Sequence, residues 1–268
     1  YTGHPLHYGP GACRVFFLAT IPAMPHHPLT PDDILFHDDR LLILNKPAGV
    51  PVHGGRILED DPETLLSMAR DLTGSMMHAA HRLDRPVSGA ILLTFDKDTL
   101  AELGFQFEQR RVRKKYLAVA RGWLDDSGTI DYPLLPPRDE RKAGSTAKPA
   151  VTHYRCLGRA EIPADIPPYP AARYSLLELE PHTGRRHQLR RHLKHVSHHL
   201  AGDTTYGRGE HNRLFRERFD CRRLLLHSLS LEFDHPDCGQ QLRIEAPLDP
   251  AFARVLDALG WAGLPGGR

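Results

Sequence analysis

Short apolar runs alternate with polar turns along most of the chain, and this pattern predicts short strands. We expect two strands at 34–36 and 41–45, around the acidic turn 38–40. The continuous apolar run that begins the segment 90–94 predicts a strand buried on both faces. Further strands are predicted at 116–120, 151–157, 174–179, 224–233 and 241–244.

Helices are predicted where apolar residues recur every three or four positions. The first should have Asp61 as its N-cap and Pro62 at its first position, and should end at Gly74. Further helices are predicted over 97–109, from the turn at 183–184 through 194, and over 251–259. Strands and helices in this irregular order favour an α+β fold built on a mixed or antiparallel sheet.

Two segments lack such a pattern. Residues 1–29 are rich in Pro, Gly and His, so we expect a disordered N-terminal extension, and Met24 is a candidate natural start that an intact-mass measurement would test. Residues 136–149 are rich in Pro, Lys and Arg and predict a mobile loop. The remaining residues, 30–263, should form a single domain with a short tail at 264–268.

Composition narrows the class of protein. With 40% hydrophobic and 25% charged residues, the chain of 268 residues matches an ordinary soluble globular protein. No apolar run approaches the ~20 residues that a membrane span needs. The four cysteines are scattered and form no CxxC pair, which favours reduced thiols in the cytoplasm over a zinc or redox site.

The distribution of charge is more informative than the net charge of +2. Five of the six residues from 110 to 115 are Lys or Arg. Residues 185–195 contain five Lys or Arg and no acid, and arginines crowd the stretch 208–223. These runs could converge on one phosphate-binding surface, or they could be three separate solvated faces.

Asp84 is the strongest candidate for chemistry. It lies in a polar loop between a predicted helix and a buried strand, with Arg82 and Arg85 on either side. Flanking cations favour an ionised carboxylate, which can act as a nucleophile or a base. The same arrangement fits a structural carboxylate in a salt-bridged turn, so the spacing alone leaves both interpretations open.

A family resemblance favours the catalytic interpretation. The segment 81–89, HRLDRPVSG, resembles the catalytic motif of the RluA family of pseudouridine synthases. Other motifs of that family are matched in order by ILFHDDRLLILNKPAG at 34–49, KKY at 114–116, EPHTGRRHQLR at 180–190, AGD at 201–203 and LLLH at 224–227. The resemblance implies an α+β fold with a mixed, mostly antiparallel, bent sheet and a central cleft flanked by helices and loops.

The resemblance also implies a role for each matched residue. Asp84 corresponds to the essential catalytic aspartate, and Arg190 to the cation paired with it. Tyr116 corresponds to a ring stacked on the target uracil. Arg82 corresponds to the side chain that enters the RNA stack when the target nucleotide is flipped out.

RNA contacts are expected around the catalytic motif and along the basic runs. The residues concerned are Arg82, Arg85, Lys46, Arg185, Arg186, Arg191, Arg113, Lys114 and Arg213. Lys46 and Arg185 could instead shape loops. Taken alone, Tyr116 also fits a core aromatic residue, and Arg190 fits one arginine among many on a basic helix.

The implied reaction needs no cofactor. It breaks the C1′–N1 bond of uridine and rejoins the uracil through C5 without redox change, and the chain has no GxGxxG or GxxxxGK[ST] motif. Five histidines between 187 and 199 raise the question of a metal site. The gap between His187 and His192 is not the spacing of a zinc helix, and no glutamate accompanies it, so we expect no metal.

The expected partner is RNA, and specifically tRNA. Stretches such as 107–109, 120–123 and 131–134 are similar to family members that modify uridine 65 of tRNA, although the run 197–200 lacks their usual proline. Ribosomal RNA or another tRNA site is the alternative substrate. A non-catalytic RNA-binding protein of the same fold, or an unrelated hydrolase, is the alternative function. No S4-type RNA-binding module and no obligate protein partner are expected.

Overall fold

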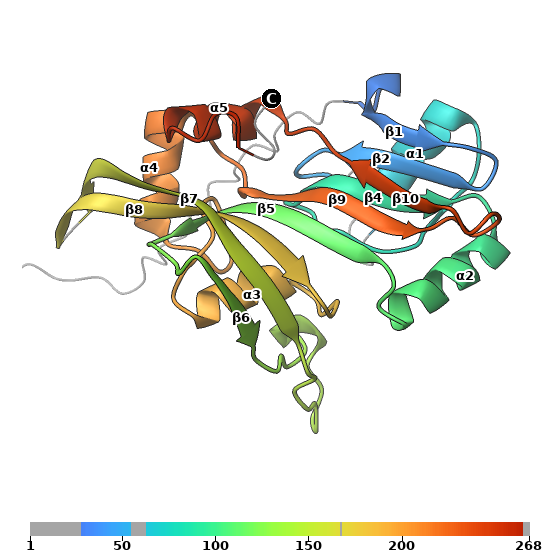
Figure 1. Ribbon diagram of the computed structural model, residues 1–268, viewed down its shortest axis with the longest axis horizontal. Helices are drawn as coiled ribbons and strands as arrows, with labels where there is room; N and C mark the ends of the chain where they lie inside the picture. Colours follow the sequence, from blue (N-terminus) through green and yellow to red (C-terminus); the bar gives the residue numbers. More distant parts are fainter. Residues whose placement is uncertain (1–27, 55–62, 167, 265–268) are drawn as a thin grey trace, which may run out of the picture.

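The computed structural model describes residues 28–54, 63–166 and 168–264, which build one ten-stranded sheet (Figure 1). The strands are β1 (Ile34–His37), β2 (Leu41–Lys46), β3 (His78–Ala79), β4 (Ser88–Thr94), β5 (Arg113–Arg121), β6 (Ser127–Asp131), β7 (Val151–Ile166), β8 (Tyr169–Pro181), β9 (Leu226–Asp234) and β10 (Gln241–Glu245). Their order in the sheet is β1-β2-β4-β9-β5-β8-β7-β6, with β10 paired to β9 and β3 paired to β4.

Helices pack on both faces of this sheet. They are α1 (Leu65–Thr73), α2 (Lys97–Glu108), α3 (Gln188–His195), α4 (Gly209–Phe219) and α5 (Pro250–Ala258), with short 3-10 helices η1 (Pro31–Asp33) and η2 (Arg138–Glu140). One core cluster joins α1 and α3 to the sheet, and a second joins α4 and α5 to the opposite face. In β5 the consecutive residues Leu117 and Ala118 belong to different clusters, because successive side chains of a strand point to opposite faces of the sheet.

The pairing of β4 with β9 is parallel, whereas the other strand pairs of the described chain are antiparallel. It brings Ser88 opposite His227 and Gly89 opposite Ser228. Gly89 has φ 107°, and a Cβ there would lie 2.3 Å from the carbonyl oxygen of Ser228. Glycine is therefore required where β4 leaves the Asp84 turn and meets β9.

The mixed, mostly antiparallel sheet expected from the sequence is confirmed, as are the predicted strands. The run 90–94 is buried on both faces, because Ile91 and Leu93 enter one core cluster and Ala90 and Leu92 enter another. Helices α2 and α5 lie within a residue or two of their predicted bounds. The long hairpin of β7 and β8 extends well past the predicted segments, and β3, β6, α4 and the short helix η1 were missed.

Two predicted helix starts are wrong. Helix α1 has Thr64 as its N-cap, with reciprocal hydrogen bonds between Thr64 and Ser67, whereas Asp61 and Pro62 lie outside the described residues. Helix α3 begins only at Gln188, because the preceding residues form a turn that the Gln188 side chain closes by accepting hydrogen bonds from Thr183 and Arg185.

Several other predictions concern the ends and loops. Residues 1–27 lie outside the described chain, and Leu29, which was expected in the extension, is buried. The predicted loop 136–149 contains η2, and its ends meet through a bridge between Leu134 and Lys148. Within the described residues, the helices are too short or too polar to cross a membrane.

Candidate active site

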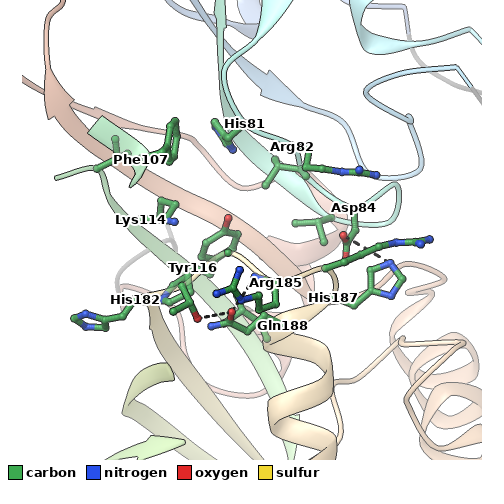
Figure 2. A pocket seen from close by; sticks show the side chains of 18 of the residues that line it. His81, Arg82, Asp84, Phe107, Lys114, Tyr116, His182, Arg185, His187 and Gln188 are labelled. Atoms are coloured by element: carbon green, nitrogen blue, oxygen red, sulfur yellow. Dashed lines mark hydrogen bonds and ion pairs between the residues drawn. The ribbon is translucent and has the colours of Figure 1, made fainter. Parts of the chain in front are cut away.

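The Asp84 turn opens into a pocket of about 1100 Å³ on one side of the sheet (Figure 2). Three parts of the chain form its walls: the turn between β3 and β4, the end of α2 with the start of β5, and the connection from β8 to α3. Asp84 and Tyr116 line this pocket together with His187. Segments that are far apart in the sequence therefore meet at the residue that carries the candidate chemistry.

Asp84 is held in a tight turn, in which the Val87 amide donates to the Asp84 carbonyl over 3.0 Å. The Asp84 side chain is 20% exposed, so its carboxylate is accessible from the pocket. Arg190 Nη1 donates to Asp84 Oδ2 at 3.3 Å, and His187 Nε2 lies 3.8 Å from Asp84 Oδ1. The predicted pairing of Asp84 with Arg190 is present.

Arg190 is itself held by a second carboxylate. Asp203 accepts from Arg190 Nε at 2.7 Å and from Nη2 at 2.9 Å, and both side chains are almost completely buried. The amides of Thr205 and Tyr206 also donate to Asp203, each over 2.9 Å. Burial opposes the charge of Asp203, but these hydrogen bonds and the Arg190 charge outweigh it and lower the pKa of Asp203.

Tyr116 projects from β5 and is only 8% exposed. Burial raises the pKa of its phenol far above the ordinary value, the Ser228 hydroxyl partly opposes this, and the Asp84 charge adds to it. The phenol is therefore neutral near pH 7. A neutral aromatic ring at the edge of the pocket can act as a platform for a flat base.

Lys46 does not lie on an RNA-binding surface, which corrects the expected phosphate contact. Its side chain is fully buried, and its ammonium donates to the carbonyls of Pro47 and Val50 at 2.8 Å and of Arg85 at 3.3 Å. A group without access to solvent cannot reach a phosphate in this conformation. The contact with Arg85 next to Asp84 supports the alternative role of shaping the loop.

The other residues with expected RNA contacts fall into two groups. Those that line the pocket are Arg82, Arg113, Lys114, Arg185 and Arg186. Arg85, Arg191 and Arg213 are not among its lining residues. Arg82 and Arg113 are exposed, whereas Arg186 is paired with Asp139 and Glu140 at 2.7 Å.

Each of the five histidines between 187 and 199 has a partner in the protein. His187 Nδ1 lies 2.9 Å from the Tyr206 hydroxyl, and His192 Nδ1 lies 2.9 Å from the Thr152 hydroxyl. The remaining partners are the Tyr132 ring for His195, the Arg121 carbonyl for His198 and the Tyr206 carbonyl for His199. In the described part of the chain, no three His, Cys, Asp or Glu side chains gather as metal ligands.

Sequence reasoning missed two structural features of the site. The first is the role of Asp203, although the AGD run at 201–203 had pointed to the residue. The second is the contact of His187 with Asp84, which no periodicity could indicate because His187 has a left-handed backbone (φ 56°, ψ 27°) just before α3.

A buried network behind the Asp84 turn was also missed. Arg223 donates to the Ser88 hydroxyl at 2.8 Å and pairs with Asp249, which caps α5. Ser88 Oγ lies 2.7 Å from His227 Nδ1, while His227 Nε2 lies 3.1 Å from the Ala246 carbonyl and must donate to it. Ser88 therefore donates to His227 and accepts from Arg223, which ties the end of the Asp84 turn to α5.

Residues 40–195 match the RNA pseudouridylate synthase family, and the chain belongs to it. This finding confirms the family resemblance inferred from the motifs. The enzyme class is therefore that of isomerases which convert uridine in RNA to pseudouridine.

Two similar proteins from bacteria support the same family. The tRNA pseudouridine synthase C of Salmonella typhi is 44% identical over 237 residues, covering 87% of this chain and 91% of the relative. The protein of the same name from Vibrio cholerae is 39% identical over 234 residues, covering 85% and 96%.

Solved structures agree on the fold. Human RNA Pseudouridylate Synthase Domain Containing 4 superposes with a TM-score of 0.64 at 27% identity, covering 85% of this chain and 93% of the other. Human RNA Pseudouridylate Synthase Domain Containing 1 gives a TM-score of 0.62 at 23% identity, covering 87% and 96%, and supports the fold alone.

Proposed function

We propose that this protein converts uridine 65 of tRNA to pseudouridine, with Asp84 as the catalytic carboxylate. The observation that carries the proposal is the placement of Asp84: it is accessible from a large pocket, oriented by buried Arg190, and shares that pocket with Tyr116. The tRNA substrate is supported by the names of the relatives, and position 65 by the motif resemblance.

The other site residues fit the physical needs of the reaction. A base inside a stack cannot be reached, so the target nucleotide must be flipped out at a cost of a few kcal/mol. Exposed Arg82 at the pocket can fill the gap that the nucleotide leaves in the stack. The Tyr116 ring then supports the uracil while its attachment to C1′ changes from N1 to C5.

Basic side chains around the pocket provide the RNA contacts of this proposal. Arg113 and Lys114 lie on one wall, and Arg185 and Arg186 lie on another. Residues 30–263 act as a single catalytic domain in the cytoplasm, with RNA as the partner and with no cofactor, since the isomerisation is redox-neutral. Asp84 can attack the base or the sugar, or remove a sugar proton, and each route uses the same carboxylate.

Tritium release tests the reaction and the residue together. Attachment through C5 expels the hydrogen at C5, so the wild-type protein should release tritium from tRNA transcripts that contain 5-tritiated uridine. Asp84→Asn should release none. Asp126→Asn is the matched control, because Asp126 also pairs with an arginine (Arg159, 2.7 Å) but lies outside the pocket.

The other outcomes separate the alternatives. Release from ribosomal RNA fragments but not from tRNA would change the substrate and retain the enzyme class. Equal release by Asp84→Asn and the wild type would refute the role of Asp84. Absence of release from every RNA would favour the non-catalytic RNA-binding protein, and mapping of the modified nucleotide tests position 65.

A further inference from the structure

His187 lies beside Asp84 in the pocket that is proposed to hold the uracil. It lines the pocket, and Figure 2 shows its imidazole facing the Asp84 carboxylate. Its Nε2 is 3.8 Å from Asp84 Oδ1, while its Nδ1 is 2.9 Å from the Tyr206 hydroxyl. The left-handed backbone of His187 is unusual for a residue other than glycine, and such conformations cluster at functional sites.

The proposed isomerisation requires a base at C5. Once C5 is joined to C1′, that carbon carries both the new bond and its original hydrogen. Loss of the proton returns the electron pair of the C5–H bond to the ring and restores the C5–C6 double bond, while N1 gains a proton. One proton therefore leaves C5 and one reaches N1, so no oxidant or other reactant is needed.

The described residues near Asp84 offer few groups that can accept this proton. Arg190 stays protonated, and burial keeps the Tyr116 phenol neutral. His81 also lines the pocket, but its Nε2 already accepts the Leu92 amide at 3.1 Å. Among the described Lys, Arg and His side chains, His187 is the one besides Arg190 that has a nitrogen within 4.0 Å of the Asp84 carboxylate, and a neutral imidazole has one free lone pair.

We propose that His187 is a catalytic residue that accepts the C5 proton through Nε2. The inference rests on the proposed function and extends it to the last chemical step. If His187 Nδ1–H donates to the Tyr206 hydroxyl, the Nε2 lone pair faces the space beside Asp84. The imidazolium formed on proton transfer then lies next to a carboxylate, as a charged intermediate requires.

The surroundings of His187 lower the pKa of its imidazole on balance. Burial lowers the pKa of His187, and the charges of Arg190 and Arg186 act in the same direction. The charges of Asp84 and Asp203 oppose this effect and favour the imidazolium.

Two further groups face the same imidazole. The Tyr206 hydroxyl contacts its Nδ1, and the charge of Asp139 also interacts with it. Because burial and the nearby arginines lower the pKa of His187 below its ordinary value, the imidazole is neutral at rest near pH 7, and it has nearby carboxylates when it becomes charged, which is what a general base requires.

The test compares His187→Asn with the wild type on tRNA containing either protiated or 5-deuterated uridine. Asparagine tolerates a left-handed backbone and lacks a basic nitrogen. We expect a single-turnover rate about 10²-fold lower, with a larger deuterium effect than in the wild type because proton removal becomes rate-limiting. Affinity for tRNA and the free energy of unfolding should stay near wild-type values.

Two further variants sharpen this test. Tyr206→Phe leaves the imidazole in place but removes its Nδ1 partner, so it should show a smaller loss of rate in the same step. His235→Asn is the matched control, because His235 also faces an aspartate (Asp38, 2.8 Å) but lies outside the pocket, and its rate should equal the wild-type rate.

Two results would overturn the inference about His187 and leave the proposed function intact. The first is a wild-type rate in His187→Asn. The second is a lower rate with an unchanged deuterium effect, which would mean that His187 only positions Asp84 or that Asp84 itself takes the proton. Absence of turnover by the wild type on every RNA is a different result, because it refutes the proposed function and the inference with it.

Discussion

Arg190 and Asp203 form a buried ion pair joined by two hydrogen bonds, at 2.7 Å from Nε and 2.9 Å from Nη2. The third guanidinium nitrogen, Nη1, donates to Asp84. One arginine therefore links the candidate catalytic carboxylate to a structural carboxylate that backbone amides also hold. The planar fork of arginine suits this arrangement, since two of its nitrogens are fixed while the third points into the site.

Asp203→Asn should destabilise the fold and reduce activity. It leaves the buried Arg190 charge without its main partner, which costs roughly 3 kcal/mol when a buried pair is broken. Urea unfolding and tritium release from tRNA measure the two effects. Asp139→Asn removes a solvent-accessible pair with Arg186 and should lower the free energy of unfolding by less than about 1 kcal/mol. Equal losses of unfolding free energy in the two variants would contradict the prediction.

Asp249→Asn should separate the two roles of this side chain. Asp249 Oδ1 caps α5 by accepting from the amides of Ala251 and Phe252, and asparagine caps equally well. Loss of the charge leaves buried Arg223 unpaired, so we expect a loss of about 2 kcal/mol in the free energy of unfolding. We also expect a lower kcat with little change in KM, because Arg223 holds Ser88 at the end of the Asp84 turn.

A second capping aspartate provides the control for that variant. Asp96 caps α2 through the Thr99 amide and pairs with Arg40 at 3.3 Å, on the surface and outside the pocket. Asp96→Asn should cost less than about 1 kcal/mol and leave kcat unchanged. A kcat in Asp249→Asn equal to that of Asp96→Asn would refute the link between α5 and the Asp84 turn.

Lys46 should make stability rise with pH. Burial, with the Arg223 charge adding to it, lowers the pKa of Lys46 to about 7 in the folded protein, against an ordinary value of 10.5. Between these values the unfolded chain binds the proton and the folded chain does not, so unfolding becomes less favourable as pH rises. Lys46→Met has no such proton to bind. Its gain in the free energy of unfolding over the wild type, measured at the same pH, should therefore shrink from pH 7 toward pH 9.

Chemical unfolding of both proteins across this range measures the difference. The comparison with Lys46→Met removes the contributions of other titrating groups, because they are common to both proteins. A difference in unfolding free energy that stays constant with pH would show that the ammonium is not disfavoured by burial.

Gly89→Ala should be far more damaging than Gly74→Ala. Both glycines have positive φ, so both variants incur a backbone cost of roughly 1–2 kcal/mol. A Cβ at position 74 meets nothing within 4 Å, whereas one at position 89 meets the Ser228 backbone at 2.3 Å. Gly89→Ala should therefore lose roughly 3 kcal/mol or more, and thermal unfolding of the two variants side by side would show whether the clash is real.

Local pattern was sufficient to predict much of the fold. The strand at 90–94, helix α2 and the left-handed cap at Gly74 follow from apolar spacing and from glycine, which depend on only a few neighbouring residues. Helix α1 was placed too early because the cap is chosen by a local competition, which Thr64 and Ser67 win through their reciprocal hydrogen bonds.

The chain by itself determined the family, the order of the motifs and the candidate aspartate, because these depend on residue types at short spacing. Only the tertiary structure decided which groups surround Asp84, since Arg190 reaches it across 106 positions of sequence. The same holds for Lys46, which reads as a surface lysine until two carbonyls of the loop after β2 and one of the Asp84 turn enclose it. Burial and long-range pairing depend on how distant segments pack, and no local pattern records that.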